Sequence, residues 1–146
     1  MGVRSSSSSG PEPGFARFVA RGLRALRTEL PWAYALMAAA LGPRDVLLAV
    51  SGETVAVTAR GGEVTAHAAP PEGFAPRVVL ATERATVLQL ADAERTIVDA
   101  VVSGEVTLRG DVDDLVAFHD GLMAFLHGAV RSPSFPALLD EYRAWV

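Results

Sequence analysis

The sequence predicts an α/β (α+β) fold with five strands. Three β-rich segments follow one another between residues 44 and 69, and two-residue Ser51-Gly52 and Gly61-Gly62 connections separate them. Segments with apolar residues at helical spacing come before and after this region. Two further strand-like segments, 77–82 and 105–110, alternate with helical ones. An antiparallel three-strand meander within a larger sheet follows from this order.

Composition limits the class of protein. Half of the 146 residues are hydrophobic, yet no stretch approaches the roughly 20 apolar residues that a membrane-spanning helix needs. The surplus apolar surface must therefore enter a core, a cavity or an interface. We expect one domain over residues 14–146, after a disordered serine-rich tail at 1–13.

Charge and motifs exclude several functions. The net charge of −4 disfavours nucleic-acid binding, and the lack of cysteine excludes disulfides and thiolate chemistry. That lack suits a reducing, cytoplasmic location in a bacterium. No Gly-x-Ser-x-Gly, His-Glu-x-x-His or phosphate-binding loop is present. We therefore expect no enzymatic activity, cofactor or metal, and the adjacent His119 and Asp120 are the nearest approach to a catalytic pair.

Two helices are expected at the start of the domain. Residues 15–30 place apolar side chains on one face, and Arg17, Arg21 and Arg24 lie on the other. Pro31 begins a second helix that Gly42-Pro43 ends.

The meander occupies 44–50, 53–59 and 63–69. Alternation puts Val55 and Val57 on one face and Thr54 and Thr58 on the other. One face of the sheet is therefore expected to be covered and the other partly hydrated.

The second half alternates helices and strands. After the strand at 77–82, Thr82 is expected to cap a helix over 83–91. A further helix closes at Gly104, a strand covers 105–110, and helices follow at 111–130 and 132–145.

Three acids begin the helix at 111. Asp111, Asp113 and Asp114 could hold a metal, but hard-cation loops carry their glycine inside the acidic run, whereas Gly110 precedes this one. We interpret Asp111 as the N-cap, and Asp113 and Asp114 as first-turn residues that favour the helix dipole.

The helix from 111 to 130 is apolar around most of its circumference. Such a helix must be buried on more than one side. The sheet can cover one side. The other side could be covered by the last helix, by a bound apolar ligand, or by a partner chain such as a second copy in a homodimer.

The stretch 76–126 resembles the sterol carrier protein type two (SCP2-like) family. It follows that family's order of strand, helix, helix, "SGEVTLRGD" and helix, with Gly104 before the strand and Gly110-Asp111 after it. The resemblance implies a five-stranded mixed sheet, covered by about five helices on one face, and a tunnel for a sterol, fatty acyl chain or phospholipid. The final "RAWV" lacks the peroxisomal address.

The resemblance implies non-enzymatic lipid binding or transfer. We expect the tunnel between the sheet and the helices at 83–103 and 111–130. Its expected wall is apolar: Val79, Leu88, Ile97, Val101, Val106, Leu108, Leu115, Phe118, Leu122 and Phe125.

Other hypotheses remain open at this point. The same fold could be an accessory module that docks, without a ligand of its own, onto an enzyme handling lipids, polyketides or isoprenoids. It could also be an isomerase or hydrolase acting on a bound lipid. Transient membrane contact through Arg17, Arg21 and Arg24 is compatible with lipid transfer.

Overall fold

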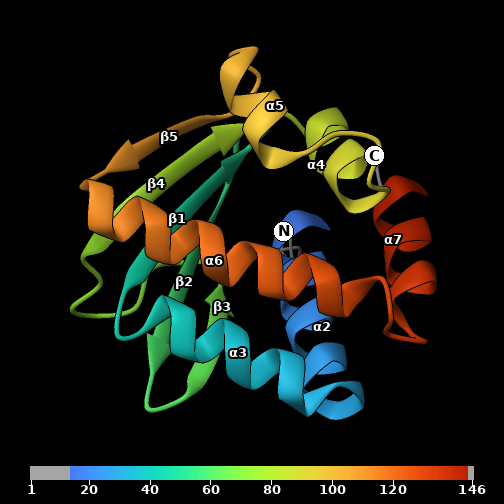
Figure 1. Cartoon of the computed structure of the whole chain (residues 1–146), viewed down its shortest axis with the longest axis horizontal. Helices are drawn as coiled ribbons and strands as arrows, with labels where there is room; N and C mark the ends of the chain where they lie inside the picture. The colour runs from blue at the N-terminus through green and yellow to red at the C-terminus, as the bar shows by residue number, and fades with distance from the viewer. Residues whose placement is uncertain (1–13, 145–146) are drawn as a thin grey trace, which may run out of the picture.

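The computed structural model describes residues 14–144, and the predicted tail at 1–13 lies outside them. Six helices and five strands occur in this range: α2 (Gly14–Glu29), α3 (Pro31–Leu41), β1 (Asp45–Val50), β2 (Glu53–Arg60), β3 (Glu63–His67), β4 (Pro76–Thr82), α4 (Arg84–Ala91), α5 (Ile97–Val102), β5 (Thr107–Gly110), α6 (Val112–Ala129) and α7 (Phe135–Ala144). Figure 1 shows them as a sheet with helices packed against it.

The five strands form one mixed sheet in the order β3-β2-β1-β4-β5. β1, β2 and β3 make the predicted antiparallel meander, β4 runs parallel to β1, and β5 is antiparallel to β4. Gly61 and Gly62 both have positive φ, which suits the tight turn between β2 and β3. The predicted fold class is confirmed.

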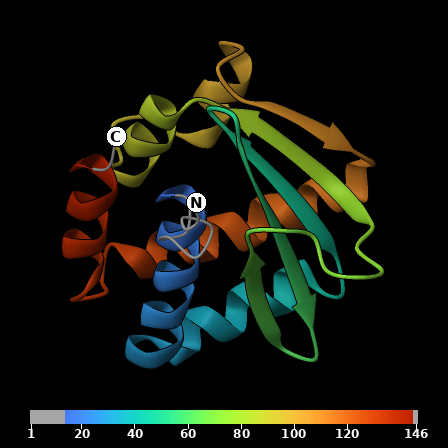
Figure 2. The ribbon, with the colours of Figure 1, turned by 180° about the vertical axis from the view of Figure 1, so that it is seen from behind.

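The helices cover one face of the sheet. Val55 and Val57 are buried beneath them, whereas Thr54 on the other face is exposed, as the alternation predicted. Seen from behind, the sheet has no helix in front of it (Figure 2). The described residues form six helices, against about five expected to cover this face.

The two sides of α6 are covered by different elements. The sheet lies on one side, and α3 packs closely along another. Gly121 and Gly128 lie two turns apart on α6. Gly121 faces α3, and Gly128 faces both α3 and Leu26 of α2. A Cβ at Gly121 would lie 2.8 Å from Leu41, and one at Gly128 would lie 2.5 Å from Leu26 and 2.8 Å from Ala33. The sequence predicted that the last helix, a partner chain or a ligand covers the second side of α6. Within the described residues, α3 covers that side instead.

The start of α6 differs from the expectation. Asp111 occupies the N-cap position, but its side chain makes no capping hydrogen bond. Asp114 is buried instead and accepts hydrogen bonds from Arg44 Nε at 2.8 Å and Arg77 Nε at 3.2 Å. The hydrogen bond from Arg44 holds the pKa of Asp114 below its usual value, and the charge of Arg77 acts in the same direction. Asp114 thus ties α6 to the sheet, which one-dimensional spacing does not reveal.

Two other expected boundaries are corrected. Thr82 ends β4 and donates its hydroxyl to the Glu105 carbonyl at 2.7 Å, so it does not cap α4. Glu83 takes the N-cap position without a side-chain capping hydrogen bond. The Ser51 hydroxyl accepts from the Arg84 amide at 2.8 Å and donates to the Glu83 carboxylate at 3.0 Å. The strand expected at 105–110 begins at Thr107, because the amides of Glu105 and Val106 bond to the Ala100 carbonyl and close α5.

Within residues 14–144, no helix has the length and apolar character that crossing a membrane would require.

The contact between α3 and α6 gives a stability prediction. Gly128→Ala forces a methyl group against Leu26 and Ala33, so the free energy of unfolding should fall by about 1–3 kcal/mol despite the better helix propensity of alanine. Gly22→Ala is the matched control, because its nearest neighbour is the edge of the Phe125 ring at 3.2 Å. Urea unfolding measures both variants. Equal stability of the two would show that α3 and α6 do not depend on this approach.

Candidate functional site

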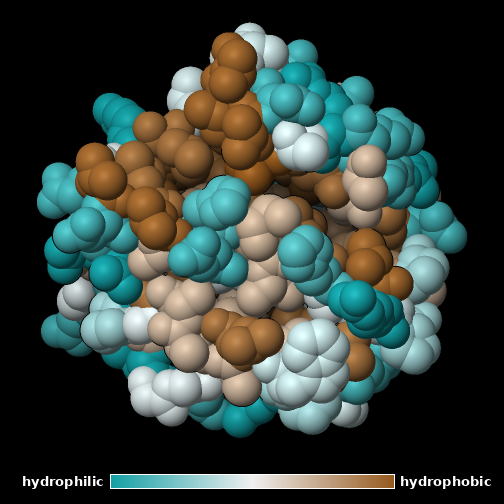
Figure 3. All heavy atoms as spheres, in the orientation of Figure 1, coloured by the Kyte–Doolittle hydropathy of each residue, from teal (hydrophilic) through white to brown (hydrophobic). Residues whose placement is uncertain are grey.

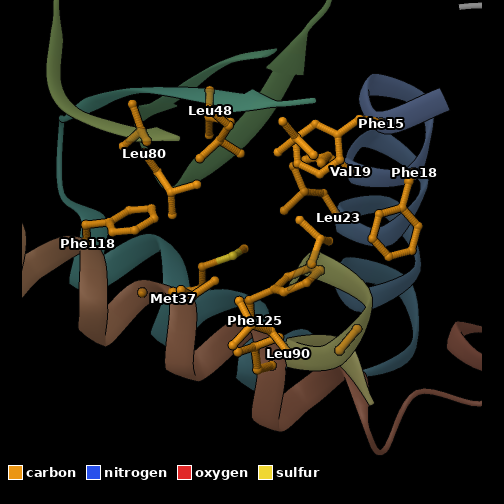
Figure 4. A pocket seen from close by; sticks show the side chains of 18 of the residues that line it. Phe15, Phe18, Val19, Leu23, Met37, Leu48, Leu80, Leu90, Phe118 and Phe125 are labelled. Carbon is orange, nitrogen blue, oxygen red and sulfur yellow. The ribbon is translucent and has the colours of Figure 1, made fainter. Parts of the chain in front are cut away.

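An apolar cavity of about 160 Å³ lies between the covered face of the sheet and the helices. Side chains from α2, α3, α4, α6 and the start of α7 enclose it, together with residues of all five strands or their immediate flanks. Figure 4 shows side chains from different elements pointing toward one space: Leu48 and Leu80 from the sheet, Phe118 and Phe125 from α6, and Val19 and Leu23 from α2.

The sheet wall follows from strand alternation. Val46, Leu48 and Val50 of β1 share one face and line the cavity, and Leu80 of β4 pairs directly with Leu48. Leu48 keeps accessible surface although β1 is flanked by strands on both sides. The helices therefore do not close fully over the centre of the sheet.

The helical walls follow from the 3.6-residue period. On α6 the lining residues Phe118, Leu122 and Phe125 are spaced by four and three positions, so they form one stripe. The amphipathic helix α2 contributes Phe15, Val19, Leu23 and its neighbour Phe18. On these two helices the lining side chains are apolar.

The polar content of the cavity is small. Thr82 is the polar side chain in its wall, and its hydroxyl is already used by the Glu105 carbonyl. Among the described residues, none that lines the cavity has a titratable side chain. A guest would meet hydrocarbon along this wall, and the described wall offers no acid or base to act on it.

No protein-family model matches the chain, and no curated protein matches it. Solved structures do. A UbiJ-SCP2 ubiquinone synthesis protein matches with a TM-score of 0.57 at 14% identity, over 80% of this chain and 95% of that one. The sterol carrier protein domain 2 of Helicoverpa armigera matches with a TM-score of 0.57 at 13% identity, over 80% and 94%.

A conserved hypothetical protein of Thermus thermophilus, described as possibly a sterol carrier protein, matches with a TM-score of 0.56. The identity is 20%, over 90% of this chain and 99% of that one. The chain has the SCP2-like fold. At these identities the likeness is one of fold, and the site must be argued from this chain's own residues.

Four of the ten residues expected to form the wall line the cavity of this SCP2-like fold. Val106 reaches it from the segment before β5, and Phe118, Leu122 and Phe125 reach it from α6. All four belong to the stretch 76–126 that carried the resemblance.

The other six expected residues lie elsewhere. Val79 is on the uncovered face of the sheet, where it pairs with Leu47. It directly precedes Leu80 in β4, and successive residues of a strand point to opposite faces of the sheet. Leu88 is partly buried on α4, but its neighbours Val87 and Leu90 line the cavity in its place.

The remaining four expected residues belong to α5, β5 and the start of α6. Ile97 is buried in the core, and Val101 is 38% exposed. Leu108 and Leu115 are partly buried against the core without lining the cavity. In this SCP2-like fold α5 thus contributes nothing to the cavity wall.

Sequence reasoning missed the walls made by α2 and α3. Met37 and Leu41 of α3 line the cavity, as do four residues of α2. The signal on α2 was present, because Phe15, Val19 and Leu23 repeat every four residues. α3 gave no such signal, since its alanines make it apolar all round.

The polar candidates lie away from the cavity wall. His119 Nδ1 lies 3.5 Å from Asp120 Oδ1, and the two side chains are 45% and 63% exposed. Arg17 and Arg21 both pair with Glu141 of α7, whereas Arg24 has no ion pair within residues 14–144. The arginine face of α2 is therefore partly neutralised by α7.

The cavity predicts binding of a small apolar probe. An apolar cavity of about 150 Å³ can stay dry and bind xenon or benzene, so xenon should bind here, as measured by the chemical shift of ¹²⁹Xe. Leu48→Trp should fill the space and abolish the shift. Leu47→Trp is the matched control on the uncovered face and should preserve it. A xenon response that survives Leu48→Trp would place the gas outside this cavity.

Proposed function

We propose that the protein binds an apolar lipid, such as a sterol, a fatty acyl chain or a phospholipid tail, between the sheet and the helices, and carries it without chemical change. The observation that supports this most is the cavity wall, which is apolar and contains no titratable side chain. Hydrophobic burial is then the driving force for binding, at roughly 25 cal/mol for each Å² of apolar surface removed from water.

The size of the cavity sets a condition on the ligand. A volume of about 160 Å³ suits part of a lipid, since a cavity of about 150 Å³ holds benzene. A longer guest must push the walls apart. α4 is the element best placed to yield, because Val87, Leu90 and Ala91 line the cavity while Thr86 alone of its residues is buried.

The fold supports the same conclusion at a coarser level. Two of the three structures compared above are described as sterol carrier proteins, one of them with the qualifier "possibly". The UbiJ-SCP2 structure is described as a ubiquinone synthesis protein, which also concerns an apolar molecule. These descriptions belong to those proteins, and for this chain they support the proposal because the cavity has matching chemistry.

Identification of a co-purifying lipid tests the proposal directly. Native mass spectrometry of the purified protein should show an adduct of lipid mass that organic extraction removes, and a fluorescent fatty acid should then bind with micromolar affinity. Leu48→Trp should weaken uptake at least tenfold, because it occupies the space, and Leu47→Trp should leave uptake unchanged. Absence of both the adduct and uptake would contradict lipid binding and favour the accessory-module hypothesis.

Membrane contact through the arginine face of α2 is a separate proposal. Arg24 is exposed and has no ion pair within residues 14–144, so it carries more of this role than Arg17 or Arg21. Arg24→Glu should reduce sedimentation with vesicles containing 30% anionic phosphatidylglycerol by severalfold, since one basic residue near such a surface contributes about 1 kcal/mol. Arg131→Glu, in the turn after α6, is the matched control. Equal sedimentation of both variants and the unmodified protein would exclude this face.

A further inference from the structure

Five valines are exposed on α5 and on the first turns of α6. We name them the valine shelf: Val98, Val101, Val102, Val112 and Val116, with exposed fractions of 57, 38, 81, 74 and 55%. Figure 3 shows apolar side chains gathered over α5 and the start of α6, with a hollow between these helices. The shelf lies on the face of the molecule where the helices cover the sheet.

Neither helix formation nor packing within the described chain accounts for the shelf. Valine loses side-chain freedom in a helix and is a poorer helix former than lysine, glutamate or alanine. Burial does not explain it either, because these side chains project into solvent. A contiguous exposed apolar surface of this kind is typical of a binding surface.

The two helices of the shelf are joined by β5, which starts near α5 and ends where α6 begins (Figure 1). Leu108 of β5 pairs with Leu80, so it lies on the covered face of the sheet, and it is partly buried. Leu115 of α6 lies beside Gly110 at the end of β5. An exposed apolar surface of this kind is suited to the apolar face of an amphipathic helix.

The charges around the shelf are mainly negative. Asp99 of α5, and Asp111 and Asp113 at the start of α6, are exposed, and their side chains have no hydrogen bond or ion pair within residues 14–144. Arg109 of β5 offsets one of these charges. The remaining negative charge repels an anionic membrane surface and attracts basic side chains.

We propose that the valine shelf is a docking site for a partner protein, which binds through an amphipathic helix with lysine or arginine beside its apolar face. The valines bury the apolar face of that helix, and Asp99, Asp111 and Asp113 pair with its basic residues. Docking here places the partner beside α5 and α6, the latter of which forms one wall of the cavity. The docking itself does not depend on lipid binding.

A designed peptide tests the docking site with the intact protein. The probe is an 18-residue amphipathic helix of leucine and lysine carrying a fluorophore, and its counterpart has glutamate in place of lysine. Fluorescence anisotropy should show the lysine peptide binding at least tenfold more tightly than the glutamate peptide. Combined Asp99→Asn, Asp111→Asn and Asp113→Asn substitutions should remove most of this preference.

Variants of the shelf localise the binding. Val102→Asp combined with Val112→Asp should weaken binding of the lysine peptide at least tenfold, and both positions are exposed enough to leave the fold intact. The matched control is Leu36→Asp combined with Val130→Asp, at exposed apolar positions outside the shelf. Binding that is equal in the shelf and control variants would overturn the proposal.

Two further measurements separate the alternatives. Leu48→Trp fills the cavity, so loss of peptide binding in that variant would show that the peptide binds by inserting a side chain into the cavity and would overturn docking on the shelf. Vesicles of pure phosphatidylcholine should bind poorly, and vesicle binding that disappears in the shelf variant would assign the surface to a membrane. Uptake of a fluorescent fatty acid by the shelf variant should stay unchanged, so that failure of docking and failure of lipid binding are distinguishable.

Discussion

The close approach of α3 and α6 is the constraint on which the rest of the structure depends. Gly121 and Gly128 lack the Cβ atoms that would meet Leu41, Leu26 and Ala33, so the two helices pack with little space between them. This contact fixes α6 from its flank, where α3 runs alongside it over the same face of the sheet. The aromatic and aliphatic stripe of α6 is then held opposite the centre of the sheet, and the cavity is the space left between the two. Larger residues at the glycines would change the distance on which the cavity depends.

Polar contacts are placed at the ends of the helices and leave the middle apolar. Asp114 joins the start of α6 to Arg44, which precedes β1, and to Arg77, which lies in β4. Glu29 at the end of α2 accepts from Ser132 and Ser134, and these hydrogen bonds lower its pKa. Such end contacts orient the helices without bringing any charge to the cavity wall. A protein built in this way can hold an apolar guest without leaving a buried polar group unpaired.

The valine shelf and the cavity make different use of apolar residues. In the cavity, side chains from the sheet and the surrounding helices face one shared space. On the shelf, Val102 and Val112 face solvent beside exposed carboxylates. The first arrangement suits a guest that is apolar throughout, and the second suits a partner that is both apolar and basic. A carrier needs both properties if its guest is handed to another protein, and the fold places the two side by side through α6.

The sequence by itself determined the strand and helix order, the antiparallel meander and the face of β2 that is buried, because alternation and helical periodicity are local properties of the chain. It also indicated four cavity residues, Val106, Phe118, Leu122 and Phe125. Tertiary structure decided the rest. Whether Val79 or Leu80 faces the helices depends on the register of β4 against β1. Whether Asp114 only favours the dipole of its helix or also binds two arginines depends on residues 37 and 70 positions away. An apolar side chain fills a core, lines a cavity or meets solvent according to which elements pack around it, and hydrophobic pattern alone carries no record of that packing.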